Sequence, residues 1–359
     1  MEMFLNDDSQ INNINNKLFN FPTKNSKNGI QQVKNYNLFN QELNTDYFKK
    51  NLEIISNFEL IDFLNYGSNS YIYTALEKQR KKKVIIKMSP KRKEMNHNIN
   101  EIIISQKLKN KNIINCNGFR DIKKNEIDYI IMEYAKYGSL LDFKNKLLKK
   151  QYFSEQLLCF FTSQILNGLK YCHMCKIAHL DIIPKNILID DYLTAKIIDF
   201  SVSLDYSKIN SNKIKLPFRG TSFYMAPEVL SSKIVKVKDL NKVDLFSLGV
   251  TLYALAFGKY PFGFTPDDDY EKIYKKIMKG IEIEDTKYYS KYFIDFLTKL
   301  LEKDINKRIN INEALNHYWI KGAQLLNNEK EKTDDLDIFL SYLIGDNIKS
   351  FRDYLYALN

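Results

Sequence analysis

Three polar residues set among apolar side chains are the strongest candidates for chemistry in this chain. The segment HLDIIPKNILID (179–190) contains Asp181 and Asn186, and KIIDFS (196–201) contains Asp199. A carboxylate beside an apolar run must be hydrogen-bonded, metal-bound or catalytic, because burying it unpaired is costly. Carboxylate and amide oxygens are ligands that Mg2+ accepts. The pattern therefore predicts a magnesium site formed by Asn186 and Asp199 beside a general base, Asp181.

A second group of candidates lies earlier in the chain and suits an anionic ligand. Lys87 ends the apolar run VIIK, and a lysine at the end of a buried strand needs an anionic partner. Glu101, fourteen residues further on, opens the apolar face of a predicted helix and is a candidate partner. Gly67 lies between two predicted strands, where a tight turn would let backbone N–H groups approach a phosphate. The alternatives are an ordinary hairpin and a surface lysine and glutamate.

Short strands followed by longer helices are predicted to position these residues. Runs rich in β-branched and aromatic residues predict strands at 58–65, 70–76 and 83–88. Amphipathic runs predict helices at 99–109 and 154–172. One face of the second helix is expected to carry Leu158, Phe161, Ile165 and Leu169. Strands before helices indicate an α+β fold, with a small β-rich lobe joined to a larger helical one.

The regions on either side of this globular pattern differ from it in composition. Residues 1–57 are rich in Asn and have no sustained period, which predicts a mostly irregular extension with a short helix around 41–54. Residues 321–359 are polar and then amphipathic, which predicts a tail that docks as one or two helices. The globular pattern itself covers residues 58–320.

The composition favours a soluble, intracellular globular protein. The chain has 359 residues, of which 44% are hydrophobic and 27% charged, and this excludes wholesale disorder, collagen-like structure and a disulfide-stapled miniprotein. Four cysteines are too few for a disulfide framework at this length. The acidic, polar start is not a signal peptide, and no uninterrupted apolar stretch reaches about 18 residues. We expect no membrane span and a cytoplasmic or nuclear location.

Two weaker signals have plainer explanations. The net charge of +11 suits an acidic partner such as nucleic acid, anionic lipid or an acidic protein. However, the lysines are spread along the chain, which favours a solvated basic surface over a nucleic-acid site. Cys172 and Cys175 have CxxC spacing, but they end an apolar helix and no second pair completes a zinc site. Helix packing is therefore the favoured reading of these two cysteines.

A series of motifs in this order resembles the eukaryotic protein kinases of the serine/threonine type. VIIK resembles the VAIK strand, HLDIIPKN the HRDLKPEN catalytic loop, and DFS the DFG motif. MAPE contains the APE motif, DLFSLGV resembles DxWSLGV, and EKDINKRININEALNHYWI resembles the family's closing segment. The resemblance covers residues 58–320 and implies a bilobal protein kinase fold with nucleotide in the cleft. It implies an N-lobe at 58–132, a hinge at 133–138 and a C-lobe at 139–320.

The same resemblance implies roles for the core polar residues. Lys87 would hold the α- and β-phosphates of ATP, and Glu101 would pair with it. Asp181 would be the catalytic base that orients the substrate hydroxyl. Asn186 and Asp199 would hold Mg2+. These residue types suit phosphoryl transfer, which depends mostly on positioning and on neutralising spread-out negative charge.

Further roles implied by the resemblance concern the nucleotide, the substrate and the fold. Thr221 would help to shape the substrate site, and Arg308 would pair with Glu228 of MAPE. Met132 matches the gatekeeper, and the backbone of the next residues would meet the adenine. The full set of predicted nucleotide-binding positions besides Lys87 is Gly67, Ile72, Ile85, Met132, Glu133, Ala135 and Leu188.

The sequence departs from the family pattern at several positions. Leu180 replaces the arginine of HRD, so a phosphate on the following loop lacks its usual charged receiver. Ser105 replaces an apolar residue, so the helix that carries Glu101 is expected to pack less firmly. The other replacements are Ser201 for the DFG glycine, Ile85 for a small alanine, and Asn65 and Ser70 for two of the three loop glycines.

The catalytic loop lacks one cation. Ile183 stands where the family has a lysine that contacts the transferring phosphate, and losing this charge removes transition-state stabilisation. Lys185 lies four residues after Asp181, where tyrosine kinases, with HRDLAARN, place an arginine for the same task. We expect Lys185 to substitute for the missing cation. The alternative is that Lys185 faces solvent, since this position is often charged in the family.

Two functions compete on these grounds. The first is a protein serine/threonine kinase that transfers the γ-phosphate of MgATP to Ser or Thr of protein substrates, without a requirement for activation-loop phosphorylation. The second is a pseudokinase, a nucleotide-binding or scaffold module with the same fold. Retention of the five core polar residues favours the kinase.

Overall fold

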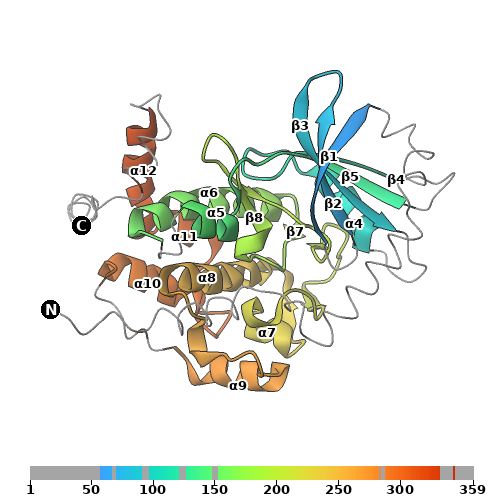
Figure 1. Cartoon of the computed structure of the whole chain (residues 1–359). Helices are drawn as coiled ribbons and strands as arrows, with labels where there is room; N and C mark the ends of the chain where they lie inside the picture. The colour runs from blue at the N-terminus through green and yellow to red at the C-terminus, as the bar shows by residue number, and fades with distance from the viewer. Residues whose placement is uncertain are drawn as a thin grey trace. The chain divides into compact units, whose positions relative to one another are not determined.

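The computed structural model describes residues 57–66, 70–90, 97–120, 127–147, 153–281, 283, 288–331 and 343. The helix expected around 41–54, the turn at Gly67 and most of the predicted tail lie outside these residues. The chain divides into two compact units, coloured along the chain in Figure 1. The first unit includes residues 58–90 and 119–134, and the second includes residues 94–118 and everything from Ala135 onward.

A five-stranded sheet lies largely in the first unit, and its first three strands follow the predicted β-rich runs. Its strand order is β1-β2-β3-β5-β4. The bounds are β1 (Phe58–Tyr66), β2 (Tyr71–Glu77), β3 (Lys82–Pro90), β4 (Cys116–Arg120) and β5 (Ile127–Glu133). β2 and β5 both pair antiparallel with β3, which is therefore interior to the sheet. The strands predicted at 58–65, 70–76 and 83–88 are confirmed.

One face of this sheet forms the apolar cluster of the first unit. Successive side chains of a strand point to opposite faces, so alternate residues of β3 share a face. Val84, Ile86 and Met88 are buried together with Ala75 of β2 and Tyr129 of β5. The other face of β3 therefore presents Ile85 and Lys87.

The second unit is mostly helical, as the α+β pattern predicts. Its helices are α4 (His97–Lys107), α5 (Leu140–Leu147), α6 (Glu155–Met174), α7 (Pro227–Leu230), α8 (Asn241–Phe257), α9 (Tyr270–Lys279), α10 (Lys291–Leu300), α11 (Ile311–Leu315) and α12 (Tyr318–Glu331). Single 3-10 turns are η1 (Pro184–Asn186), η2 (Ser222–Tyr224), η3 (Val237–Asp239) and η4 (Pro261–Gly263). Short strands are β6 (Gly138–Ser139), β7 (Ile177–Ala178), β8 (Ile187–Ile189), β9 (Ala195–Ile197), β10 (Leu204–Asp205), β11 (Lys213–Lys215) and β12 (Ile234–Lys236).

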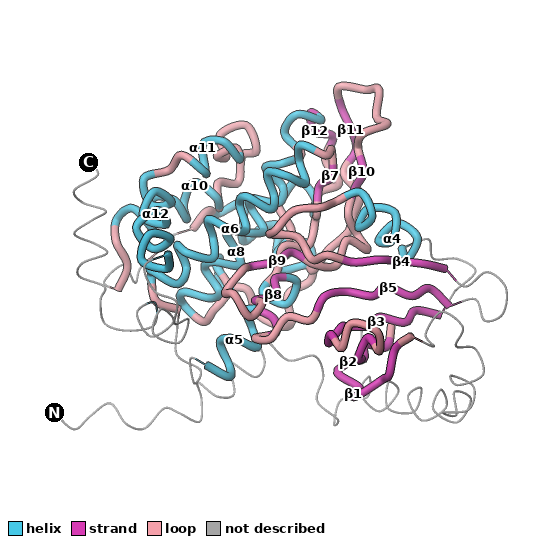
Figure 2. Tube along the Cα trace, turned by 90° about the horizontal axis from the view of Figure 1, so that it is seen from above, coloured by secondary structure: helices cyan, strands magenta, loops and turns pink. Residues whose placement is uncertain are grey.

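Helix α6 lies at the centre of this unit. The Ser154 side chain caps its first turn by accepting a hydrogen bond from Leu157 N at 3.2 Å. The four residues expected on one face are buried, but Leu157, Phe160 and Leu166 on other faces are buried too. The expected apolar face is therefore confirmed, and the other faces are buried as well because α6 is packed by α8, α11, α12 and β9 (Figure 2). Cys172, in its last turn, is buried, and burial raises the pKa of its thiol, which favours packing over metal binding.

Helix α8 is the most apolar helix of the described chain. The stretch Val237–Phe257 is long and apolar enough, with a mean hydropathy of 1.2, to cross a membrane by length and composition alone. However, 83% of it is buried inside the protein, as expected for the core helix of a globular domain. Gly258, with φ of 65°, ends the helix, and its N–H donates to Ala254 O at 3.0 Å.

Candidate active site

The loop between β7 and β8 is fixed by a buried carboxylate on α8. Asp244 accepts hydrogen bonds from the backbone N–H groups of His179 at 2.9 Å and Leu180 at 2.7 Å. Leu180 has a φ of 67°, a left-handed conformation that is rare for a bulky residue, and its side chain is only 3% exposed. Asp244 thus holds the backbone immediately before Asp181 in a conformation that the chain would not adopt unaided.

Asp181 is oriented from two directions. Asn186 Nδ2 donates to Asp181 Oδ2 at 2.9 Å and to Asp181 O at 3.0 Å. The backbone N–H of Thr221 donates to Asp181 Oδ1 at 2.8 Å. This second contact depends on Gly220, whose φ is 107° and where an added Cβ would lie 2.3 Å from Leu180 O. Asp181 and Asn186 of one motif and Thr221 of another are therefore brought together.

The environment of Asp181 strengthens its hold on a proton. Burial raises the pKa of Asp181 from its ordinary value of 3.8, and the Asp199 carboxylate adds to this shift. The hydrogen bonds from Thr221 favour the charged form and oppose the shift. A carboxylate with a raised pKa that is held by donors on both oxygens suits a general base.

The two predicted metal ligands lie at the ends of neighbouring strands. The backbone N–H of Ile198 donates to Asn186 O at 3.0 Å, which places Asp199 one residue beyond this contact. Asn186 Nδ2 donates to Asp181, and no described residue donates a hydrogen bond to Asn186 Oδ1. Asp199 has a φ of 65°, and one of its carboxylate oxygens accepts from Ser201 N at 3.3 Å. One amide and one carboxylate oxygen form a donor set that fits Mg2+.

Helix α4 carries Glu101 and is tied to the segment that follows Asp199. Asn100 Nδ2 donates to Ser203 O at 2.9 Å and to Phe200 O at 3.4 Å. Lys107 Nζ contacts Asp205 Oδ2 at 2.6 Å. Two side chains of α4 thus contact the segment between Phe200 and Asp205.

Ser105 is accommodated in α4 by a hydrogen bond rather than by apolar packing. The side chain is buried, and its Oγ donates to Glu101 O one turn earlier. This bond satisfies a hydroxyl that would otherwise be costly to bury, so the replacement of an apolar residue leaves α4 intact through this turn. Glu101 itself is only 4% exposed.

Four predicted nucleotide-binding residues share one face of the sheet in the first unit. Ile72 lies directly opposite Lys87, and Ile85 lies directly opposite Met132. Because directly opposite residues and alternate residues of one strand project to the same side, all four lie on one face. Glu133 pairs with Val84 and lies on the other face.

The remaining nucleotide candidates belong to the second unit. Ala135 is buried, and its carbonyl oxygen accepts from Gly138 N at 3.1 Å in the turn before β6. Leu188 is half-buried in β8, opposite Ser139 and Lys196. Ala135 thus lies in the turn that leads into β6, and Leu188 lies in β8, the strand next to β6 in the small β6-β8-β9 sheet.

Lys185 is half-buried in η1 and close to the N-terminal part of α5. Burial lowers the pKa of Lys185 from its ordinary value of 10.5, and the Asp142 carboxylate opposes this shift. Asp142 in turn accepts from Ser139 N at 2.9 Å and from Ser139 Oγ at 2.7 Å. Ile183, at the position of the missing lysine, packs against the apolar core of the second unit. A fully solvent-facing Lys185 does not fit this environment.

The protein kinase domain family matches residues 58–320 of this sequence. The chain belongs to this family.

Individual relatives agree with this family. The sequence is 30% identical over 273 residues to "CBL-interacting serine/threonine-protein kinase 12" of Arabidopsis thaliana, covering 75% of this chain and 53% of that protein. It is 33% identical over 276 residues to "Aurora kinase" of Dictyostelium discoideum, covering 74% of this chain and 66% of that protein. It is 32% identical over 292 residues to "Serine/threonine-protein kinase RAD53" of Saccharomyces cerevisiae, covering 76% of this chain and 34% of that protein. The chain thus spans less than two thirds of the length of these relatives.

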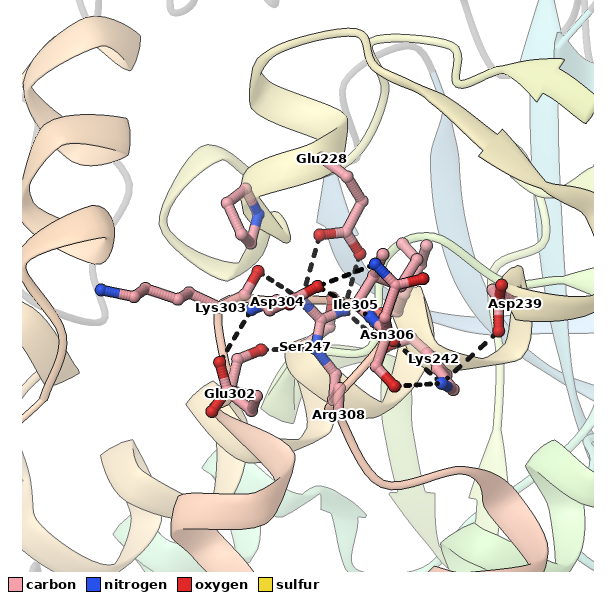
Figure 3. Close-up of polar contacts among 12 residues, drawn as sticks. Glu228, Asp239, Lys242, Ser247, Glu302, Lys303, Asp304, Ile305, Asn306 and Arg308 are labelled. Atoms are coloured by element: carbon pink, nitrogen blue, oxygen red, sulfur yellow. Dashed lines mark hydrogen bonds and ion pairs between the residues drawn. The ribbon is translucent and has the colours of Figure 1, made fainter.

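The closing segment of the kinase domain is anchored by the predicted ion pair. Arg308 Nη1 and Nη2 donate to the two carboxylate oxygens of Glu228 at 2.6 and 3.0 Å (Figure 3). The Arg308 side chain is fully buried, and it also donates to Glu302 O at 2.7 Å and to Lys242 O at 2.9 Å. The guanidinium lies 4.9 Å from the ring centroid of Phe246. The pairing implied by the motifs is confirmed.

Three residues that position the site were not singled out from the sequence of the kinase domain. Asp244 had a usable signal, because an acid inside the apolar run DLFSLGV must find donors. The sequence around Asn100 and Gly220 gave no signal of comparable strength. The contacts of Asn100 reach residues 100 or more positions away, and the need for glycine at 220 arises from its approach to Leu180 O.

Proposed function

We propose that this protein is a serine/threonine protein kinase that transfers the γ-phosphate of MgATP to Ser or Thr of protein substrates, with its kinase domain at residues 58–320. The observation that carries the proposal is Asp181, whose carboxylate is held by Asn186 and Thr221 and whose pKa is raised. The family membership and the names of the relatives support the same activity.

The proposal gives a task to each residue around Asp181. Thr221 N and Asn186 Nδ2 fix the two carboxylate oxygens, so the carboxylate is already oriented before a substrate hydroxyl arrives. Asp181 orients that hydroxyl and accepts its proton as the phosphoryl group is transferred. Asn186 and Asp199 would hold Mg2+, which when bound neutralises charge on the phosphate oxygens.

Phosphate transfer from ATP to a degenerate Ser/Thr peptide library tests this function. We expect transfer by the full chain and a loss of about 100-fold or more in the Asp181→Asn variant. We also expect Asp199→Ala to abolish Mg2+-dependent stabilisation by ATP in a thermal-shift assay. Nucleotide binding without any transfer by the wild-type chain would reject the kinase and select the pseudokinase.

We further propose that activity does not require phosphate on the activation loop. Leu180 stands where a phosphate receiver is expected, and its side chain is buried and apolar. Protein groups contact the start of the loop instead: Asn100 binds its backbone and Lys107 pairs with Asp205. Burial alone would raise the pKa of Asp205, but hydrogen bonds from Lys107 and from Ser207 outweigh it and lower the pKa. Asp205 therefore pairs with Lys107 of α4 as a carboxylate at neutral pH.

The loop serines differ in what a kinase could reach. Ser203 is 1% exposed, and its Oγ donates to His179 O at 3.0 Å, so it is not an accessible acceptor. Ser207 and Ser211 are exposed. We expect phosphatase treatment and the Ser207→Ala/Ser211→Ala double variant to leave kcat within about twofold. Loss of activity that rephosphorylation of either serine restores would contradict the proposal.

A cytoplasmic or nuclear location is proposed on the state of the thiols. Cys116, Cys159, Cys172 and Cys175 are all free, and the first three are buried. Reduced buried thiols are typical of proteins in a reducing compartment. Microscopy of a fluorescent fusion tests this location, and retention in the secretory pathway would contradict it.

A further inference from the structure

A two-stranded ribbon joins the activation loop to the segment after MAPE. β11, which belongs to the loop, pairs antiparallel with β12. Lys213 lies directly opposite Lys236, and Lys215 directly opposite Ile234. Backbone hydrogen bonds extend the pairing on both sides, from Val237 N to Asn212 O at 3.0 Å and from Leu216 N to Lys233 O at 3.2 Å. Figure 2 shows the two strands side by side.

The ribbon has one apolar face and one lysine face. Ile214 and Val235 lie between the exposed positions and pack against the apolar core of the second unit. Lys213, Lys215 and Lys236 are exposed on the other side together with Ile234, because alternate residues of a strand project to opposite faces. We call these three lysines the lysine face.

The charge of the lysine face is not balanced by neighbouring acids. Residues 206–238 contain seven basic residues and one acidic residue, Glu228, which is buried and paired with Arg308. The acids at either end of this stretch, Asp205 and Asp239, pair with Lys107 and Lys242. The lysine face makes no ion pair with any described residue. Like charges placed directly opposite each other destabilise a strand pair. No ion pair with a described residue offsets this repulsion, and this indicates that the lysine face has a role in binding an acidic partner.

The lysine face is within reach of the predicted phosphate acceptor. Thr221 N is 2.8 Å from Asp181 Oδ1, and Lys215 lies six residues earlier in the chain. Six residues span at most about 20 Å, so Lys215 lies within roughly that distance of Thr221. An extended substrate covers the same distance in about six residues. Acidic side chains near the acceptor residue can therefore reach the lysine face.

We infer that the lysine face binds acidic residues of the protein substrate, within about six positions of the Ser or Thr that is phosphorylated. This inference rests on the proposed kinase function, because it assigns the substrate class of the same site. Carboxylates of a peptide complement the unpaired ammonium groups, and a peptide lying across Asp181 and the ribbon satisfies both sites at once. Nucleic acid and anionic membranes carry the same sign of charge and are outcomes of the test.

Binding measured without ATP separates this inference from the kinase proposal. The probe is a fluorescent peptide with one Ser and with Asp or Glu at flanking positions, compared by anisotropy with an isomer that has Asn and Gln instead. The test variant is Lys213→Glu/Lys215→Glu/Lys236→Glu. The control variant is Lys259→Glu/Lys272→Glu/Lys279→Glu, which makes the same change in net charge at exposed lysines just after α8 and on α9.

We expect the test variant to weaken binding of the acidic peptide by about tenfold or more, and the control variant by less than about twofold. The isomer should bind weakly to all three proteins, and added salt should weaken only the acidic peptide strongly. Equal effects of the two variants would overturn the inference. So would loss of binding to an RNA oligonucleotide or an anionic vesicle with peptide binding unchanged. If the test and control variants differ in peptide binding as expected but the chain transfers no phosphate, the lysine face would be supported as a binding surface for acidic peptides and the kinase function would be rejected.

Discussion

Replacing Asp244 by Asn tests whether the buried carboxylate of α8 sets the catalytic loop. Asp244 is fully buried and accepts from Leu180 N with Oδ1 and from His179 N with Oδ2. Oδ2 also lies 2.8 Å from His173 Nε2. Burial alone would raise the pKa of Asp244, but the contacts with His173 and His179 outweigh it and lower the pKa. The carboxylate is therefore charged in the folded protein at neutral pH.

The magnitude follows from counting acceptors. Asparagine has the shape of the Asp244 side chain but only one oxygen that can accept a hydrogen bond. If this oxygen keeps the hydrogen bond from Leu180 N–H, the NH2 group of the asparagine faces His179 N–H, which then has no acceptor. One buried donor left unpaired costs about 1–3 kcal/mol, and losing the charge weakens the remaining bond by roughly 1 kcal/mol. We expect Asp244→Asn to lower the free energy of unfolding by about 2–4 kcal/mol. Because Leu180 then loses part of what holds its left-handed φ, Asp181 should shift, and kcat should fall about 10- to 100-fold.

Two measurements check this expectation. Denaturant unfolding gives the change in stability, and phosphate transfer to the peptide library gives kcat. Asp267→Asn is the matched control, because Asp267 is exposed and its replacement should change neither quantity. The lowered pKa also fixes a sign: the stability due to Asp244 is present above about pH 3.8 and is lost as the pH falls through the folded pKa. Wild-type stability and kcat in the variant would refute the role of Asp244.

Three further outcomes are expected. Glu228→Gln should lower the free energy of unfolding by about 3–5 kcal/mol, since it leaves the buried charge of Arg308 without its counter-ion; a urea unfolding curve unchanged from wild type would contradict this. kcat/KM should fall as the pH drops through a pKa above 3.8, because the raised pKa of Asp181 protonates the base earlier than an ordinary carboxyl; an acidic limb at or below 3.8 would argue against the assignment. Lys185→Ala should lower kcat by roughly 10- to 1000-fold, and Ile183→Lys should restore much of this loss; zero coupling in the double-mutant cycle would remove Lys185 from the reaction.

The fold of this chain was largely predictable because its strongest sequence patterns are local. The β-branched runs at 58–65 and 83–88 became β1 and β3 within two residues at each end. The motif order then placed Arg308 opposite Glu228, 80 residues apart. What local patterns could not give was the surroundings of each element. The pattern of α6 predicted one apolar face, and the burial of its other faces depends on α8, α11 and α12, which follow it in the chain.

The candidate site shows the same limit more sharply, because its geometry opposes local preference. Leu180 and Asp199 both have positive φ, which neither residue type favours over glycine; Leu180 precedes the predicted base, and Asp199 is itself a predicted metal ligand. From the sequence alone, Leu180 was interpreted only as a replacement of the HRD arginine. In the structure its backbone is bound by Asp244 from α8, and its carbonyl oxygen is approached so closely by residue 220 that only glycine fits there. The position of Asp181 is therefore determined by segments about 40 and 60 residues away, and changes in those segments should alter activity without touching any residue of the catalytic motif.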